Sequence, residues 1–247
     1  MKRCFETAPI VVGGVGGSGT RVVAEMLEAL GFFLGDDLNH AHDNMGLARR
    51  FDEIQSRVPG PPDGSADITD ILEAFERDMH AAYLAQATRR AGWGWKVPAN
   101  FFILPQLARH FGPVRYIHVI RHGLDMAFSS NQNQTRNFGR HYGVDAAARP
   151  LPQASLAYWI RANTWALETV RGLGLDHLVL DFDRLCTDPH GGAGHLLRFL
   201  GRDDTDLARL AGLVEPPASI GRYRDQDLGF VTAADRAAIQ RLGFAVA

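Results

Sequence analysis

The sequence predicts an α/β protein with a central parallel sheet flanked by helices on both faces. Short apolar runs alternate along the chain with longer segments of helical periodicity. These runs are continuous, as is typical of parallel strands covered on both faces, and a glycine-rich turn joins the first run to the first helical segment. With 247 residues the chain can bury a core of its own, so we expect one domain over 1–247. The pattern leaves the order of the strands open.

Four apolar runs are predicted to be the strands, and the helices are placed between them by the spacing of apolar residues. The strands lie at 10–13, 93–98 (WGWKVP), 114–120 (VRYIHVI) and 177–183 (HLVLDFD). The helices are expected at 20–30, 67–90, 103–110, 123–130 and 153–173, with shorter ones near 191–200, 205–213 and 232–242. Gly31 is expected to end the first helix, and Asp67 or Thr69 to cap the second. Two polar stretches, 35–65 and 131–152, are expected to be loops that form variable substrate or lid segments.

Charge and cysteine content narrow the classes of function. The 26 Lys and Arg against 28 Asp and Glu give a net charge of −2, so nothing indicates nucleic acid or an anionic membrane as partner. No apolar run approaches the about 18 residues of a membrane span, and the first residues lack the pattern of a signal peptide. The two cysteines, Cys4 and Cys186, suit neither a metal site nor a disulfide framework. We expect a reduced, cytoplasmic protein without a metal.

The glycine-rich turn after the first strand is predicted to hold a phosphate-like group. Glycine's freedom at positive φ lets successive backbone N–H groups face one anion, and the following helix adds the positive end of its dipole. The residues concerned are Gly14, Gly16, Gly17, Ser18, Gly19, Thr20 and Arg21. Gly14 and Gly19 have the spacing of a Walker loop, but Thr20 and Arg21 replace its lysine and its Mg²⁺-binding hydroxyl. The loop therefore suits a phosphate-like group better than Mg·ATP, and a tight turn without a ligand is the simpler alternative.

The segment GVGGSGTR resembles the 5′-phosphosulfate loop of sulfotransferases that use 3′-phosphoadenosine 5′-phosphosulfate (PAPS). Ser18, Gly19 and Thr20 match that loop, whereas Gly17 stands where the family has lysine or arginine. The resemblance implies a three-layer P-loop-like fold with a central parallel sheet, PAPS as donor, 3′,5′-bisphosphoadenosine as product and no required metal.

A second block, RYIHVIRHGLDMAFSSNQ at 115–132, resembles the 3′-phosphate motif of the same family. Arg121 and Ser129 have the family's interval of eight residues, and Gly123 and Asp125 are also in pattern. Arg121 would lie at the carboxyl end of a strand, where ligands bind in open α/β sheets, and its guanidinium suits bidentate phosphate binding. The alternative is an arginine paired with Asp125 and a solvated serine.

Lys96 and Arg21 are the candidates to stabilise charge during transfer, since Gly17 brings no cation. WGWKVP resembles the short family strand that carries a lysine and then proline two residues later. Only Lys2 and Lys96 are lysines in this chain, so an interior lysine needs a reason of its own. The alternative is a lysine whose ammonium reaches solvent from a strand end.

The segment DDLNHAHDNMG at 36–46 follows the first helix and should overhang the cleft. It offers His40, His42 and Asp43 as bases for the acceptor's proton. His118 lies inside a strand and is expected in the core.

Residues near the C-terminus complete the expected nucleotide site. The segment LDFDRLCTDP resembles a family strand, although its LVLD part also fits a Walker B strand. In SIGRYRDQDLG, at 219–229, Arg222 or Arg224 would contact the 3′-phosphate and Tyr223 would pack on the nucleotide. Trp159 is either an adenine contact or a core residue.

The leading hypothesis is a PAPS-dependent sulfotransferase that moves a sulfuryl group in line to a hydroxyl or amine acceptor. The acceptor would be a small molecule or a carbohydrate, and Arg136, Arg140 and His141 would favour an anionic one. The alternatives are an ATP-dependent nucleotide or small-molecule kinase and a non-catalytic nucleotide-binding protein. The sequence does not indicate an oligomeric state.

Overall fold

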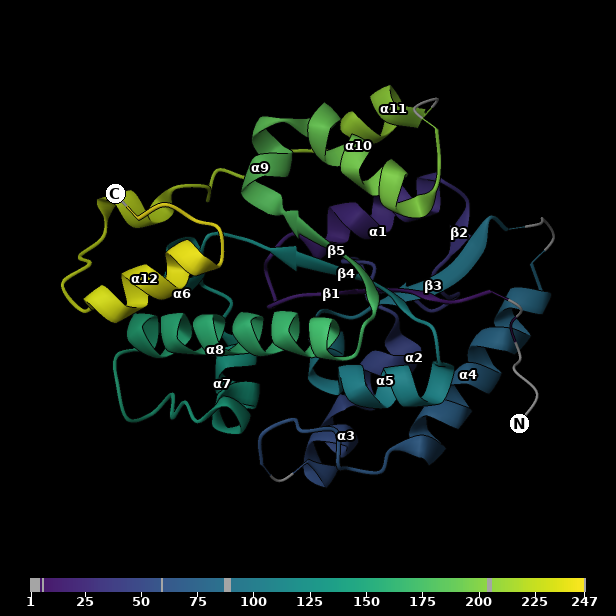
Figure 1. Ribbon diagram of the computed structural model, residues 1–247, viewed down its shortest axis with the longest axis horizontal. Helices are drawn as coiled ribbons and strands as arrows, with labels where there is room; N and C mark the ends of the chain where they lie inside the picture. Colours follow the sequence, from purple (N-terminus) through teal and green to yellow (C-terminus); the bar gives the residue numbers. More distant parts are fainter. Residues whose placement is uncertain (1–4, 6, 59, 87–89, 204–205, 247) are drawn as a thin grey trace.

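The computed structural model describes residues 5, 7–58, 60–86, 90–203 and 206–246. Five parallel strands form the central sheet in the order β2-β3-β1-β4-β5 (Figure 1). Their bounds are β1 Ile10–Gly13, β2 Phe32–Phe33, β3 Gly92–Lys96, β4 Arg115–Ile120 and β5 Asp176–Asp181. The α/β class with helices on both sides of a parallel sheet is confirmed.

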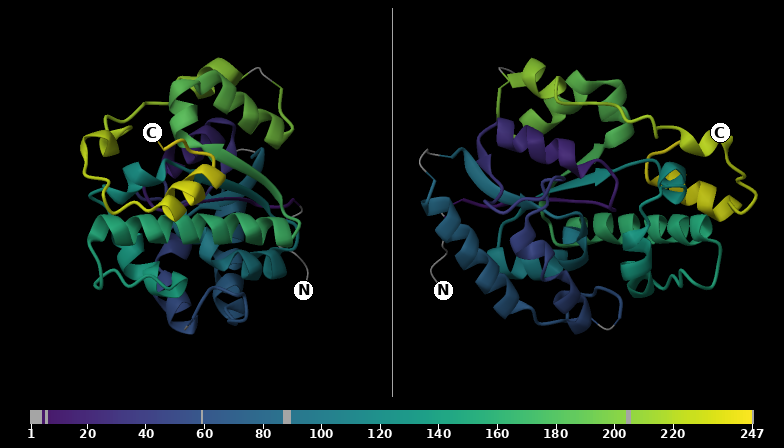
Figure 2. Two further views of the ribbon diagram at one scale, coloured as in Figure 1. Left: turned by 60° about the vertical axis from the view of Figure 1, so that its left-hand side comes forward. Right: turned by 180° about the vertical axis from the view of Figure 1, so that it is seen from behind.

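Helices cover both faces of the sheet, which gives three layers (Figures 1 and 2). Apolar side chains of β1 alternate between the two layers, with Val11 in one core and Ile10 and Val12 in the other. On one face lie α1 Thr20–Ala29, α9 Phe182–Thr187, α10 Pro189–Leu200 and α11 Leu207–Ala211. On the other lie α4 Thr69–Leu84, α5 Leu104–Phe111 and α8 Leu151–Gly172, and α12 Ala233–Arg241 packs beside α8.

The predicted strands lie where they were expected, but the prediction omitted one strand of the sheet. All four predicted strands are present, but β5 ends at Asp181, where the Asp181 carboxylate accepts a hydrogen bond from Arg184 N–H and starts α9. The fifth strand, β2, has two residues and exists through pairing with Gly92 and Trp93 of β3. A run so short carries no period that the sequence could show.

The two stretches expected to be loops contain short helices, so that expectation is wrong in part. In 35–65 the chain forms α2 Met45–Ala48 and α3 Phe51–Arg57, and the Asn44 side chain caps α2. In 131–152 it forms α7 Asn133–Phe138 and the 3₁₀ turn η2 Gly139–Tyr142. Each of these helices places apolar residues, such as Ile54 and Phe138, in the core.

Several helix ends differ from the prediction for local reasons. The helix expected at 67–90 runs from Thr69 to Leu84, with Asp67 Oδ1 accepting from Thr69 N–H, and residues 87–89 lie outside the described part. The helix expected at 103–110 is α5, and a 3₁₀ turn, η1 Pro98–Ile103, precedes it. The helix expected at 123–130 is α6 Gly123–Ala127.

The register of β1 sets up the site. Val12 pairs with Lys96 of β3, and Gly13 pairs with His118 of β4, so the carboxyl ends of three adjacent strands meet at one edge. The turn after β1 holds the glycines, β3 ends at Lys96, and Arg121 follows β4 directly. These three features therefore come together, as expected for ligand sites in open α/β sheets.

Two aromatic residues considered for the site belong to the core. His118 is fully buried, its Nε2 lies 2.8 Å from Asn163 Oδ1, and burial lowers its pKa to about 4. Trp159 is 1% exposed, and a Cβ on Gly123 would lie 2.5 Å from its Cε3. The prediction for His118 is confirmed, and Trp159 supports α6 from within the core.

Candidate functional site

A cleft of about 650 Å³ opens at the carboxyl edge of the sheet. The glycine loop and α1 form one wall, the ends of β3 and β4 form the floor, and the segment 212–217 closes it from the C-terminal half. The predicted site residues that line it are Gly16, Gly17, Gly19, Thr20, Arg21, Asp43, Lys96 and Arg121. Residues from four separate parts of the sequence thus face one space.

The glycine loop has the backbone geometry of an anion site. Gly17 and Gly19 adopt φ values of 95° and 91°, in the left-handed region that favours glycine. A Cβ on Gly19 would lie 2.1 Å from Cδ2 of Phe182, so the loop also needs glycine there for space. No described residue accepts a hydrogen bond from the N–H groups of Gly17, Gly19 or Thr20. These N–H groups, at the start of α1, are available to an anion in the cleft.

Ser18 supports the loop from within and does not face the cleft. It is fully buried, its N–H donates to Val15 O at 3.0 Å, and its hydroxyl donates to the same carbonyl. Thr20 is 5% exposed and lines the cleft, so it is the loop hydroxyl closest to any ligand. Spacing alone could not separate these two roles, because both residues fall in the same motif.

Gly17 cannot be exchanged for the usual cation without strain. Its φ of 95° disfavours any side chain, and a Cβ there would lie 3.3 Å from Met126 Cε. The nearest cation on α1 is Arg21, which lines the cleft and pairs with Glu25 across 3.3 Å. Its side chain is 56% exposed, so this pair is weak and the guanidinium can turn to a ligand.

Lys96 is a buried cation at the floor of the cleft. Its side chain is 2% exposed, and its Nζ donates to Asp43 Oδ1 at 2.5 Å and to Ala41 O at 2.6 Å. Burial lowers its pKa, and the hydrogen bond and charge of Asp43 oppose that shift. Lys96 therefore does not reach solvent from the strand end, and the segment 41–43 covers it.

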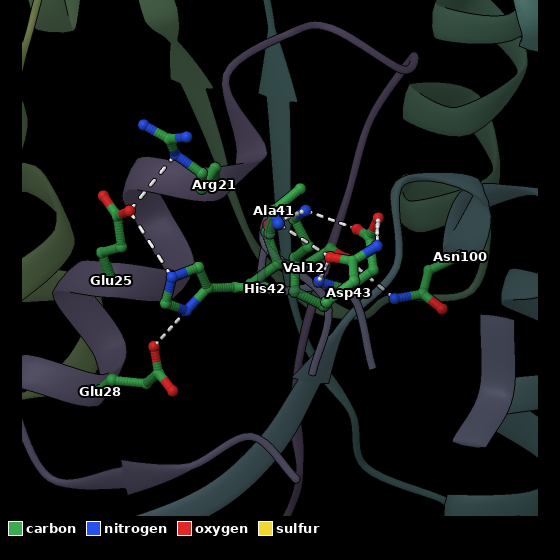
Figure 3. A network of polar contacts seen from close by, with 10 residues as sticks. Val12, Arg21, Glu25, Glu28, Ala41, His42, Asp43 and Asn100 are labelled. Atoms are coloured by element: carbon green, nitrogen blue, oxygen red, sulfur yellow. Dashed lines mark hydrogen bonds and ion pairs between the residues drawn. The ribbon is translucent and has the colours of Figure 1, made fainter. Parts of the chain in front are cut away.

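The structure separates the three candidate bases. Figure 3 shows His42 turned towards Glu25 and Glu28 of α1, whereas Asp43 points the other way. His42 Nδ1 lies 2.5 Å from Glu28 Oε2, and its backbone adopts φ 60°. His40 is exposed, and neither histidine lines the cleft. Asp43 does line it, so geometry favours the carboxylate.

A short turn holds Asp43 in place. The Asn39 side chain accepts from the N–H groups of Ala41 and Asp43, both at 2.9 Å, and its Nδ2 donates to Asp43 Oδ2 at 3.0 Å. One Asp43 oxygen thus meets Asn39 while the other meets Lys96. The carboxylate has a defined orientation in the absence of any ligand.

Arg121 is a buried cation at the end of β4. It is 5% exposed, its Nη2 donates to Ser219 Oγ at 2.9 Å, and its buried Nε has no hydrogen-bond partner among the described residues. Its guanidinium carbon lies 5.5 Å from the centre of the Phe182 ring. Burial lowers its pKa, while Asp183 and Asp125 oppose the shift, so the group stays charged at neutral pH. Arg121 Nη2 lies 3.8 Å from Asp125 Oδ2, so the pairing with Asp125 that was the alternative to a phosphate site is present.

Comparison with known proteins agrees with this geometry. The model of the sulfotransferase family matches residues 9–206. The chain belongs to the sulfotransferase family. That match covers the glycine loop, Lys96 and Arg121, and no curated protein sequence matches the chain.

Solved sulfotransferases share the fold at low sequence identity. The sulfotransferase domain of the Synechococcus PCC 7002 olefin synthase has a TM-score of 0.58 at 15% identity, over 97% of this chain and 95% of that one. A sulfotransferase from Alicyclobacillus acidocaldarius has a TM-score of 0.55 at 14% identity, over 98% of both chains. Sulfotransferase STF1 of Mycobacterium tuberculosis H37Rv has a TM-score of 0.54 at 15% identity, over 96% of this chain and 76% of that one.

The C-terminal arginines of this sulfotransferase differ in position. Arg222 donates to Ser219 O at 3.1 Å and to Phe128 O at 3.4 Å, beside Arg121, whose pKa its charge helps to lower. Arg224 is exposed and folds back on Gly221. Tyr223 is 9% exposed and stacks on His122 with ring centres 4.5 Å apart. Tyr223 therefore anchors the C-terminal segment, and its packing on a nucleotide stays a prediction.

Ser129 lies near the predicted 3′-phosphate region but does not line the cleft. It follows the end of α6, and its Oγ accepts from Asn131 N–H at 3.2 Å. The structure shows no contact between Ser129 and Arg121. Phe128, the residue before it, is held by Arg222, so Ser129 is adjacent to a second arginine.

Sequence analysis missed several residues that line the cleft. These are Phe182, which follows β5, and the segment 212–217 with Leu213, Glu215 and Pro217, whereas Asn131 begins the stretch 131–152 that was expected to form a substrate or lid segment. Phe182 could have been found, because residues just after parallel strands face the ligand edge. The segment 212–217 lies between helices and carries no such signal.

The described residues also bear on membranes and metals. No helix among them is both long enough and apolar enough to cross a bilayer. In the same part of the chain, no group of three His, Cys, Asp or Glu side chains has the arrangement of a metal site. The structure does not favour LVLD as a Walker B strand. Its carboxylate, that of Asp181, caps α9, and burial raises its pKa.

Proposed function

We propose that this sulfotransferase transfers a sulfuryl group from PAPS to a hydroxyl or amine acceptor, without a metal. The observation that carries the proposal is one cleft lined by two separate sets of possible anion ligands. The free N–H groups of Gly17, Gly19 and Thr20 form one, and the buried guanidinium of Arg121 forms the other. A nucleotide with phosphate groups at both its 5′ and its 3′ positions needs this combination.

The residues present fit that nucleotide. A buried guanidinium nitrogen without an acceptor is costly, and the Nε of Arg121 is such an atom. A 3′-phosphate would satisfy it, with Arg222 and Ser129 as the neighbouring polar groups; Arg224, which is exposed and does not line the cleft, takes no part. The loop N–H groups, Thr20 and Arg21 would hold the 5′ group, with Gly16 and Ser18 shaping the turn.

The chain's own residues account for charge and proton movement. PAPS, when bound, supplies a sulfuryl group on a good leaving group. Lys96 and Arg21 stabilise negative charge on the oxygens that change during transfer. Asp43 takes the proton of the acceptor, because its carboxylate lines the cleft in an orientation fixed by Asn39 and Lys96.

We further propose that the acceptor is a small molecule or a carbohydrate, bound where the segments 35–65 and 131–152 meet the cleft of a single domain. Arg136 and Arg140 are exposed and line a separate hollow of about 690 Å³ in the second of these segments, so they favour an anionic acceptor that extends from the cleft to this hollow. His141, expected to join them, is 1% exposed and its Nδ1 lies 3.0 Å from Gly60 O. It therefore contributes packing to this segment rather than a surface charge.

The test is transfer from PAPS to a panel of hydroxyl and amine acceptors in EDTA, followed by release of 3′,5′-bisphosphoadenosine. The proposal predicts acceptor-dependent release that Lys96→Ala strongly reduces. A parallel panel with ATP and Mg²⁺ tests for a kinase, and phosphorylation of an acceptor would contradict the proposal. Binding of bisphosphoadenosine without transfer to any acceptor would instead support a non-catalytic binding protein.

A further inference from the structure

The side chain of Gln134, in α7, is hydrogen-bonded to the backbone of the glycine loop. Its Oε1 accepts a hydrogen bond from Gly16 N–H at 2.8 Å and another from the Tyr158 hydroxyl of α8 at 3.3 Å. A Cβ on Gly16 would lie 3.3 Å from Gln134 Cδ, so the side chain lies directly against the loop backbone. Gln134 lines a small hollow with Val15 and Tyr158, and it is not among the residues that line the main cleft.

The hydrogen bond from Gly16 fixes the peptide plane between Val15 and Gly16. In a trans peptide the N–H and the C=O point in opposite directions, so holding Gly16 N–H on one side holds Val15 O on the other. Val15 O accepts from both the N–H and the hydroxyl of Ser18. The bend from Val15 to Ser18 then sets the direction of the Gly17 and Gly19 N–H groups.

The turn that carries Gln134 is itself well anchored. Gln132 is 5% exposed, and its Nε2 donates to the carbonyls of Met126, Ala127 and Ser129 at 2.8, 3.1 and 2.9 Å. These bonds end α6 and fix the approach to α7. Met126, from the same turn, also lies against Gly17. Gln134 therefore holds the loop from a rigid base.

We propose that Gln134 is a positioning residue that sets the glycine loop for the 5′ group of the nucleotide. This inference rests on the proposed function. Gln134 acts through the Val15–Gly16 peptide and does not contact the nucleotide. Because α7 belongs to the segment expected to form an acceptor wall, Gln134 also connects that wall to the donor loop. Its loss weakens only those ligands that carry a 5′ group.

The test compares two ligands on the purified full chain by calorimetry. They are 3′,5′-bisphosphoadenosine, which uses both anion sites, and adenosine 3′-monophosphate, which lacks the 5′ group. Gln134→Met keeps the volume but removes the acceptor, and Gln134→Asn keeps the amide but shortens its reach. Both variants are expected to weaken the bisphosphate about five- to tenfold, since one hydrogen bond is lost. Neither is expected to change the affinity for the monophosphate.

Tyr158→Phe is the matched control, since it removes the second partner of Gln134 and leaves the bond to Gly16. Its affinity for both ligands should stay close to that of the unchanged protein. An equal loss for both ligands in the Gln134 variants would show a general structural role and overturn the inference. Unchanged or tighter binding of the bisphosphate would also overturn it. If the unchanged protein binds neither ligand, the proposed function itself is wrong. If the unchanged protein binds the bisphosphate and the Gln134 variants bind it equally well, only the inference about Gln134 is wrong.

Discussion

Lys96 Nζ lies 2.5 Å from Asp43 Oδ1, with the lysine side chain 2% exposed and the carboxylate 20% exposed. The buried cation and the candidate base are therefore a single ion pair, with the carboxylate on the side of the cleft. Under the proposed function, Asp43 takes the proton of the acceptor and Lys96 stabilises negative charge during transfer. Removing either partner leaves the other in a poorly solvated position.

The first prediction concerns the base. Asp43→Asn keeps the shape of the side chain and removes its capacity to take a proton, so kcat should fall by roughly 10²- to 10⁴-fold. Affinity for 3′,5′-bisphosphoadenosine should change little, because Asp43 lies on the acceptor side. His40→Asn is the control, since His40 is exposed and outside the cleft, and it should retain activity. The opposite pattern in these two variants would move the base from Asp43 to His40.

The second prediction is an opposite response of activity and stability to alkaline pH. Burial lowers the pKa of Lys96 from its ordinary 10.5, so the folded protein loses this proton before the unfolded chain does. Activity that needs the ammonium should fall as pH rises through the lowered pKa. In the same window the unfolded state binds more protons, so the contribution of Lys96 to the free energy of unfolding should rise with pH up to 10.5.

Lys96→Arg provides the control for this pH dependence, because a guanidinium does not titrate in that range. The alkaline fall of kcat/KM should move upward or disappear in the variant, as measured over a pH series with PAPS. An unchanged alkaline fall would assign it to a different group.

The third prediction concerns the 3′-phosphate. Arg121→Ala should weaken 3′,5′-bisphosphoadenosine roughly 10- to 100-fold, the value of one or two charge-assisted hydrogen bonds. Adenosine 5′-monophosphate, which has no 3′-phosphate, should bind the variant and the unchanged protein alike. Arg224→Ala is the matched control, because Arg224 is exposed and does not line the cleft. Calorimetry with both nucleotides decides the matter, and an equal loss for both would remove Arg121 from the 3′ site.

The sequence shows the edge of the sheet where the site lies because parallel strands end together. Lys96 and Arg121 each lie at a strand end, and the glycines follow a third strand. Knowing the fold class was therefore enough to predict that these residues lie close together. The roles of neighbouring residues could not be predicted in this way. His42 and Asp43 are adjacent in a loop that has no period, and the φ of 60° at His42 is what turns them apart.

The short helices and the short strand could not be predicted from the sequence for a different reason. β2 depends on its partner β3, and α2 and α3 depend on a cap and on core contacts from Leu47 and Ile54. None of them is long enough for a periodic signal. The inward direction of Ser18 is likewise set by Val15 O, a tertiary detail of the loop.

The fourth prediction is that a lysine restored at Gly17 does not improve the site. Gly17→Lys places a side chain at φ 95° against Met126, and should lower the free energy of unfolding by about 1–2 kcal/mol. Gly17→Ala carries the same backbone strain without the charge, so it separates the two effects. Chemical denaturation and bisphosphate titration check both variants. Tighter bisphosphate binding by Gly17→Lys than by the unchanged protein would show that the loop can accept a cation.

The most direct measurement compares two nucleotides by calorimetry on the unchanged protein. We expect 3′,5′-bisphosphoadenosine to bind in EDTA, and ATP with Mg²⁺ to bind far more weakly, because the cleft is lined by the glycine loop and Arg121 and has Thr20-Arg21 in place of the Walker residues. Metal-dependent ATP binding that exceeds bisphosphate binding, or no binding of the bisphosphate at all, would contradict the account.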